Sequence, residues 1–433
     1  MADDFIIYLE DGSAVTVGDL LDYPAQYHRI KTKDPIEPDY DGSRTVGIAY
    51  LFNGRPTLYS QAHGGKSYRL IRRPHEIEHA NGRTFETVNA SLQLLRELPD
   101  FFDLGEQLVT IESGQLKILN PDLLPYYLSS VIQYFSHKER KGEVVKYLID
   151  PPLNVVKQIL ALGIGRRLKP LKAIINAPII TTDDHILNHA GYDIKTQLYL
   201  AMNDMPLSVP REVNKVQAKS ALDFLMKPFQ GFPFVDAIDR SVCLSAILTA
   251  VVRPVLETSP AIAIDAPKQG TGKTYLAQCI GYLSMGINVS PMPSLEKNED
   301  EIRKRLFSAL IRGSRTILWD NVMGLFNSAS LATFLTAPTF SDRILGRSET
   351  IELPNKVLFL ITGNNLQIAG ELPRRVLTCR LDSRLENPTS RSFNFNPLAY
   401  LTQYRMELVQ AALILIRGYL QSIKSTPFEA VKS

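Results

Sequence analysis

The chain has 433 residues, of which 45% are hydrophobic and 21% are charged, and its formal net charge is only +3. This length predicts two to four globular domains with a sizeable core. The small net charge excludes a global positive field, so any DNA surface must be a local patch. Three scattered cysteines exclude a disulfide framework, and the acidic N-terminus and short apolar runs exclude a signal peptide and a membrane span. We therefore expect a soluble, cytoplasmic protein.

Four regions follow one another along the chain. Residues 1–90 alternate short apolar runs with turn-forming residues, which predicts a β-rich N-terminal domain. Residues 91–232 are expected to form a helical and hairpin linker or collar, a candidate for DNA contact or oligomerisation, because helical spacing runs from 85 to about 175. Residues 233–390 alternate strand and helix patterns, which is typical of an α/β nucleotide-binding core. Residues 391–433 predict a C-terminal helical segment.

The strongest motif lies at residues 261–275, where a short apolar strand enters a glycine-rich loop that precedes a helix. Gly270 and Gly272 let the backbone bend so that N–H groups point at phosphate oxygens, and the helix N-terminus adds positive charge. Lys273 is expected to reach the β- and γ-phosphates and Thr274 to bind Mg²⁺. ATP and Mg²⁺ are therefore the predicted cofactors. The predicted nucleotide-binding residues are Pro267 (where the full pattern has glycine), Lys268, Gln269, Gly270, Thr271, Gly272, Lys273, Thr274 and Tyr275.

A second apolar strand at residues 316–321 ends in an acid. Asp320 is expected to hold Mg²⁺ and its water shell together with Thr274. Asn321 stands where such proteins usually have a glutamate that polarises the attacking water, so either it only orients water or the base lies elsewhere. Acids that favour a helix N-terminus anyway are the candidates for a relocated base: Glu296, Glu299 and Glu301.

A third strand, at residues 356–365, carries Thr362 and Asn364 at its end, where a polar sensor would contact the γ-phosphate or water. Ten residues later, Arg374 and Arg375 are expected to reach across a subunit boundary to a neighbour's γ-phosphate and neutralise its charge. The predicted catalytic residues are Lys273, Asp320, Asn321, Asn364, Arg374 and Arg375.

The order and spacing of these elements resemble the AAA+ class that includes superfamily 3 helicases. More closely, the chain is similar to the helicase half of the primase–helicase proteins of phages and integrative elements. The resemblance is specific from about residue 260 to 390, and Asp-Asn in place of Asp-Glu is familiar in that family. The larger relatives carry an N-terminal primase domain that is not expected here, so a separate primase or replication initiator is a candidate partner. The stretches that carry the resemblance are 320–322, 331–336, 341–346, 362–366, 372–376 and 386–388, and outside the core 60–65, Tyr68 and 191–193 look like further family stretches.

Residues 341–353 predict a β-hairpin with a Gly-Arg-Ser turn. The resemblance implies that this hairpin points into the central channel of a ring, where a basic tip grips single-stranded DNA. Arg347 is the predicted tip residue and Arg343 the alternative, although Arg343 could instead serve the intersubunit nucleotide site. Two further basic clusters, at 138–141 and 166–172, are candidates for DNA contact or solvated surfaces.

The sequence thus predicts an α/β fold: an AAA+ P-loop NTPase core with a β-rich N-terminal region, a helical middle region and a C-terminal helix. The leading hypothesis is an ATP-dependent helicase, a hexameric ring that acts on single-stranded or forked DNA during replication of a phage or mobile element. The first alternative is an AAA+ loader or remodeller that acts on a protein partner. The second is a regulatory module that binds nucleotide without turnover.

Overall fold

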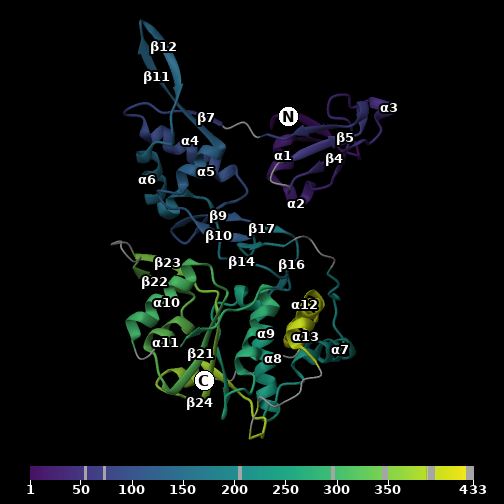
Figure 1. The fold of residues 1–433 in the computed structure, drawn as a ribbon, viewed down its shortest axis with the longest axis vertical. Helices are drawn as coiled ribbons and strands as arrows, with labels where there is room; N and C mark the ends of the chain where they lie inside the picture. Colours follow the sequence, from purple (N-terminus) through teal and green to yellow (C-terminus); the bar gives the residue numbers. More distant parts are fainter. Residues whose placement is uncertain are drawn as a thin grey trace. The chain divides into compact units, whose positions relative to one another are not determined.

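The computed structural model falls into two compact units (Figure 1). The first unit comprises Met1–Asp103, Gln107–Ile111 and Ile118–Lys169, and the remaining residues belong to the second unit. None of the described helices is long and apolar enough to cross a membrane. The structure describes residues 1–52, 56–71, 75–202, 207–293, 298–343, 350–386, 388 and 395–425.

The N-terminal part of the first unit is rich in short strands, as its alternating pattern predicts. The side chains of Ile7, Val17 and Leu58 are fully buried in one apolar cluster. Helices α1 (Val17–Asp22) and α2 (Pro24–Tyr27) follow a two-stranded antiparallel pair. The strands, in chain order, are β1 (Ile6–Tyr8), β2 (Ala14–Thr16), β3 (Lys31–Thr32), β4 (Gly47–Tyr50), β5 (Thr57–Ser60) and β6 (Lys66–Arg69), of which the last four form one antiparallel sheet.

The prediction of a helical stretch from residue 85 to about 175 is wrong for much of its length. Strands separate the three helices α4 (Thr84–Glu97), α5 (Leu124–Val131) and α6 (Leu153–Ala161). Lys141 and Gly142 both have positive φ angles, of 53° and 81°, and this two-residue turn closes a hairpin. The strands are β7 (His75–Glu78), β8 (Phe101–Leu104), β9 (Gln107–Glu112), β10 (Gln115–Ile118), β11 (Ile132–Arg140) and β12 (Glu143–Leu148).

The second unit is built around a five-stranded sheet in which every strand pairing is parallel. The spatial order β20-β21-β24-β19-β25 differs from the chain order. After β19 the chain forms the edge strand β20, then β21 and β24, and finally β25 on the other side of β19. In such sheets ligands bind beyond the carboxyl ends of the strands, where the direction of winding changes. The strands are β19 (Ala261–Ala266), β20 (Met292–Pro293), β21 (Thr316–Phe326), β24 (Leu358–Ile368) and β25 (Val376–Arg380).

Helices pack against this sheet, and all six residues of β19 are buried. Asp236 caps α8 by accepting the N–H groups of Ile238 and Asp239, while α9 begins after Gly272 and ends at Gly286, both in the left-handed conformation. The helices are α7 (Lys215–Met226), α8 (Ala237–Val252), α9 (Lys273–Met285), α10 (Glu299–Ile311), α11 (Ala329–Thr336), α12 (Pro397–Gln403) and α13 (Arg405–Ser425). A mixed α/β arrangement with a parallel sheet is therefore present, as the sequence predicts.

Short strands complete the second unit. Within the predicted helical and hairpin region 91–232, short strands pair between residues 179 and 200. The predicted hairpin at 341–353 is also present as an antiparallel pair in which Arg343 lies opposite Thr350. These strands are β14 (Ala173–Ile175), β15 (Ile179–Ile180), β16 (Ile186–Leu187), β17 (Gly191–Asp193), β18 (Leu198–Leu200), β22 (Thr339–Arg343) and β23 (Thr350–Pro354).

Candidate functional site

The glycine-rich loop (residues 267–272) leaves the carboxyl end of β19 and leads directly into α9. Gly270 and Gly272 have φ angles of 75° and 100°, a region that residues with a side chain rarely adopt. The backbone N–H groups of residues 270–274 have no hydrogen-bond acceptor among the described residues. Unpaired N–H groups at a helix N-terminus form a favourable site for an anion such as phosphate.

Lys273, the first residue of α9, points its side chain toward the end of β24. Its Nζ donates to Asn364 Oδ1 at 2.7 Å and to the carbonyl oxygen of Lys268 at 3.1 Å. Burial lowers the pKa of the Lys273 ammonium group, while Asp265 and Asp320 act in the opposite direction. A partly desolvated ammonium held by neutral oxygens is well placed to exchange one of them for a phosphate oxygen.

Asp320 lies within β21, where its side chain meets that of Thr274 from the first turn of α9. The Asp320 Oδ1 atom accepts hydrogen bonds from Thr274 Oγ1 at 2.6 Å and from Thr362 Oγ1 at 2.5 Å. Thr362 Oγ1 in turn accepts the backbone N–H of Asn321 at 3.1 Å. A hydroxyl and a carboxylate oxygen side by side fit the oxygen ligands that Mg²⁺ prefers when it also binds phosphates and water. The predicted pair of metal ligands is therefore adjacent in the structure.

Two asparagines at this edge of the sheet have left-handed backbone conformations. Asn321 has a φ angle of 57° and lies where the pairing of β21 with β24 shifts register, and Asn365 has a φ angle of 48°. The Nδ2 atom of Asn365 lies 3.5 Å from the carbonyl oxygen of Pro267. Asparagine tolerates this conformation better than most residues, which turns the chain at the point where β21 and β24 pass the loop.

Asp265 is a site residue that the sequence analysis missed. Its carboxylate, within the buried strand β19, accepts the backbone N–H of Leu366 at 2.8 Å and pairs with Arg380 Nη1 at 3.0 Å. Arg380 ends β25, and its backbone N–H donates to Asp239 Oδ1 at 2.6 Å. The available signal was an acid inside the apolar run Ala-Ile-Ala-Ile-Asp-Ala, because a buried carboxylate requires partners. Arg380 is thus held at the carboxyl edge of the same sheet.

The aromatic ring of Tyr275 lies beside the loop and packs with Phe232, at a centroid distance of 6.2 Å. The Tyr275 hydroxyl donates to Asn396 Oδ1 at 2.8 Å. A Cβ atom built on Gly272 would lie 3.5 Å from the Phe232 ring. Phe232 is therefore an apolar surface next to the loop that the sequence analysis did not identify.

Arg374 and Arg375 lie at the opposite end of the sheet from the loop. The carbonyl oxygen of Arg375 accepts the N–H of Ala261, which begins β19, whereas the loop follows the end of that strand. Arg374 is exposed at the end of a short 3-10 helix (η5, Leu372–Arg374), and Arg375 pairs with Glu371 at 3.6 Å. The structure does not bring either arginine to the glycine-rich loop of the same chain.

Of the two predicted DNA contacts, only one can be located. Arg343 is exposed at the end of β22, and its backbone N–H donates to Asp342. Arg347 lies outside the described residues, between the two strands of the hairpin.

Two further residues of the glycine-rich loop, Lys268 and Gln269, are exposed. The Lys268 Nζ atom donates to the carbonyl oxygens of Leu385 and Glu386 at 3.2 Å.

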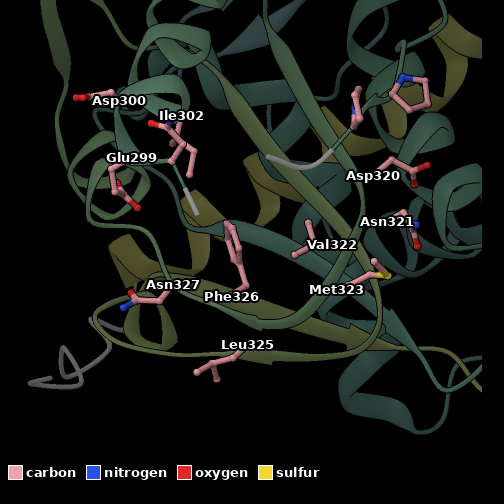
Figure 2. A pocket seen from close by; sticks show the side chains of 13 residues that line it. Glu299, Asp300, Ile302, Asp320, Asn321, Val322, Met323, Leu325, Phe326 and Asn327 are labelled. Carbon is pink, nitrogen blue, oxygen red and sulfur yellow. The ribbon is translucent and has the colours of Figure 1, made fainter. Parts of the chain in front are cut away.

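A cleft of about 1370 Å³ lies beside Asp320 (Figure 2). Asp320 and Asn321 line it together with Glu299 and Asp300 from α10, but the glycine-rich loop does not contribute to its wall. Polar side chains from two elements thus border a space next to the predicted metal ligands. The glycine-rich loop, where phosphate binding is predicted, lies outside this cleft.

The candidates for a relocated base have other partners or cannot be placed. Glu299 accepts the backbone N–H of Ser330 at 2.8 Å and the hydroxyl of Ser328 at 3.1 Å. Burial raises the pKa of Glu299, but these hydrogen bonds outweigh it, and the net pKa is lowered. Glu301 pairs with Arg305 at 3.5 Å, and Glu296 lies outside the described residues. A helix-start role therefore accounts for Glu299 and Glu301.

Comparisons with known proteins do not assign this chain to a protein family. Neither a protein-family profile nor a curated protein sequence matches this chain. The apo structure of the NrS-1 C-terminal region aligns at 13% identity over 76% of this chain and 72% of that chain, with a TM-score of 0.37. The JCV helicase aligns at 15% identity over 51% and 69% of the two chains, with a TM-score of 0.26. The SCCmec type IV Cch, described as an active helicase, aligns at 11% identity over 92% and 64%, with a TM-score of 0.29. Such low TM-scores do not establish a shared fold.

Proposed function

We propose that the chain binds ATP with Mg²⁺ at the glycine-rich loop and hydrolyses it. One observation carries this proposal. Lys273, Thr274, Asp320 and Asn364, which come from three separate stretches of sequence, converge on a loop whose N–H groups have no acceptor among the described residues. In ATP hydrolysis the protein contributes mainly positioning and electrostatic stabilisation of the phosphates. The four side chains and the loop N–H groups supply both.

Each residue then has a distinct role. The N–H groups of residues 270–274 bind phosphate oxygens, and Lys273 exchanges Asn364 for the β- and γ-phosphates. Thr274 and Asp320 hold Mg²⁺, which neutralises negative charge on the phosphates when it is bound. The amides of Asn321 and Asn364 orient the attacking water, because neither asparagine can remove its proton.

The position of Arg374 and Arg375 supports a site shared between subunits. Both lie at the far end of the sheet from their own loop, and Arg374 is exposed, so either arginine can complete only the site of another copy. A head-to-tail contact of this kind closes into a ring when its rotation permits. We propose a hexameric ring, on the basis of the resemblance to superfamily 3 helicases.

We further propose that this ring is a DNA helicase of a phage or mobile element. The β22–β23 hairpin carries Arg343 at its exposed end, where a basic side chain contacts the phosphate backbone of single-stranded DNA. Such a contact is salt-dependent and largely indifferent to sequence. A separate primase or replication initiator is the partner that this function requires for primer synthesis.

The proposal is tested by measuring strand separation on a forked duplex and ATP hydrolysis with and without single-stranded DNA. We expect DNA-stimulated hydrolysis and ATP-dependent unwinding by the wild-type protein, and neither by Lys273→Ala. Lys304→Ala, which removes an exposed lysine of α10, is the matched control and retains both. Hydrolysis stimulated by a protein partner and not by DNA would instead establish the loader function, and binding without turnover a regulatory one.

A further inference from the structure

A smaller cavity, of about 100 Å³, lies at the other end of the parallel sheet from the glycine-rich loop. Arg315 immediately precedes β21 and Lys356 precedes β24, and both line this cavity. Lys172 and Arg312 complete its charged wall. Among the described residues that line it, none carries a carboxylate. We call this space the basic cavity.

Arg315 is the buried member of this wall, with only 8% of its surface exposed. Its Nη1 donates to the carbonyl oxygen of Ile174 at 3.1 Å, but its buried Nε has no hydrogen-bond partner within the described part of the chain. A buried donor without a partner is rare in folded proteins and destabilises the structure, so it indicates a missing acceptor.

The positive charge around the basic cavity is compensated only in part, because the acid Glu257 acts on Lys356 and no acid contributes to the pKa shift of Arg315. Burial, together with repulsion from Arg405 and Arg253, lowers the pKa of Arg315 to about 10. Burial likewise lowers the pKa of Lys356 to about 8, with Arg253 and Lys172 adding to the effect and Glu257 opposing it. Repulsion among these cations is relieved when an anion binds between them.

The cations that do have partners are bound to neutral oxygens. Arg253 donates to the carbonyl oxygens of Val357, Asn355 and Leu256, and Lys356 donates to that of Leu256. Backbone carbonyls satisfy hydrogen bonds but carry no full negative charge, so they leave the net positive charge in place. The arrangement therefore differs from an ordinary buried ion pair such as that of Arg166 with Asp103.

We propose that the basic cavity binds a phosphate group, with Arg315 as the buried donor and Lys172, Arg312 and Lys356 around it. The arginine fork matches phosphate oxygens in geometry as well as charge. A volume of about 100 Å³ is about three times the share of one water molecule, which suits a phosphate group but not a nucleoside. The group is therefore either a phosphodiester of a nucleic acid whose bases remain outside or a free phosphate ion. This site is separate from the proposed ATP site.

The test uses Lys273→Ala as the background, so that the glycine-rich loop does not contribute to phosphate binding. Inorganic phosphate is titrated by calorimetry into this protein, and a fluorescent oligo(dT) strand is titrated by anisotropy. Lys172→Ala with Arg312→Ala removes two exposed cations of the cavity wall without opening the core. Lys219→Ala with Lys304→Ala removes the same charge from the exposed surface of α7 and α10 and is the matched control.

We expect the cavity variant to bind at least one of the two ligands about tenfold more weakly than its parent, and the control to bind both as the parent does. Weaker oligo(dT) binding identifies a nucleic-acid phosphate, whereas a loss confined to inorganic phosphate identifies the free ion. Equal binding of both ligands by the cavity variant and its parent would overturn the proposal, and so would an equal loss in the control. Because the background lacks Lys273, none of these outcomes depends on the proposed ATPase activity.

Discussion

The Nζ atom of Lys273 donates a hydrogen bond of 2.7 Å to Asn364 Oδ1, although the two residues are 91 positions apart in the sequence. The contact forms because β19 and β24 are neighbouring parallel strands in which Ala266 lies opposite Asn364. The lysine that we propose binds phosphate is therefore hydrogen-bonded to the proposed sensor in this structure. Under the proposed function, a phosphate that draws Lys273 away would also release the Asn364 amide and so couple binding at the loop to β24.

Replacing Lys273 with alanine is expected to reduce ATP turnover by about 100-fold or more, because one preorganised charged donor to the phosphates is lost. The measurement is phosphate release under saturating ATP and Mg²⁺. Thermal unfolding of the same samples checks that the fold is intact. Wild-type turnover in Lys273→Ala would show that this loop is not the site of hydrolysis.

Thr274→Ala and Thr274→Ser separate the hydroxyl group from the rest of the side chain. We expect alanine to raise the Mg²⁺ concentration needed for half-maximal turnover, since it removes one oxygen beside Asp320, and serine to restore the wild-type value. Turnover is measured across a Mg²⁺ titration at fixed ATP. An identical Mg²⁺ dependence in all three proteins would contradict the assignment of this pair to the metal.

Asp265 and Arg380 are expected to be coupled in stability. Arg380→Ala leaves the buried carboxylate without its cation and should destabilise the protein by about 1–2 kcal/mol, a value reduced because the arginine is half-exposed. In an Asp265→Asn background, which retains an acceptor for the Leu366 N–H, the same change should have a smaller effect. Urea unfolding of the four proteins measures the cycle, and strictly additive changes would argue against the ion pair.

Arg375→Ala should leave nucleotide binding intact and stop hydrolysis, because we propose that this arginine acts on the site of a neighbouring subunit. The sharpest measurement mixes Arg375→Ala protein with Lys273→Ala protein, each inactive alone. Their mixed interfaces combine an intact loop with an intact arginine, so partial ATPase activity should return. Absence of recovery together with an active Arg375→Ala protein would move this role to Arg374 or Arg343.

Lys356 should give the unfolding free energy a specific pH dependence. Its pKa in the folded chain is lowered to about 8, so between pH 8 and the ordinary lysine value of 10.5 the unfolded chain binds more protons. Stability contributed by this residue must therefore rise with pH through that window. Lys356→Met removes the titration, and the stability of the wild type relative to this variant should increase from pH 8 to 10. A constant difference would contradict the lowered pKa.

The local part of the site could be predicted from sequence, since a strand, two glycines and Lys273-Thr274 are contiguous and their geometry follows from backbone chemistry. The positions of Asp320 and Asn364 were also recognisable, because apolar runs stop there, although β21 and β24 continue beyond them to Phe326 and Ile368. The ion pair between Asp265 and Arg380 could not be predicted from the sequence. It depends on which strands become neighbours, and strand order is set by tertiary packing.

The middle of the chain shows the limit of periodicity. Apolar spacing between residues 85 and 175 is compatible with helices, yet the left-handed turn at Lys141–Gly142 reverses the chain and pairs β11 with β12. The basic cavity could not be predicted either, since Arg315 and Lys356 precede strands of the parallel sheet and Lys172 precedes β14 of another sheet, and only tertiary packing brings them together. Single basic residues in a sequence do not indicate which of them will face the same space.

The most direct test of the proposed ATP site is an experimental structure of the protein with a non-hydrolysable ATP analogue and Mg²⁺. We expect the β- and γ-phosphates to lie against the N–H groups of residues 270–274, with Lys273 moved from Asn364 to the phosphates and the metal between Thr274 and Asp320. An arginine of the adjacent subunit should face the γ-phosphate. A nucleotide bound elsewhere, or a glycine-rich loop that stays empty at saturating analogue, would contradict the proposed function.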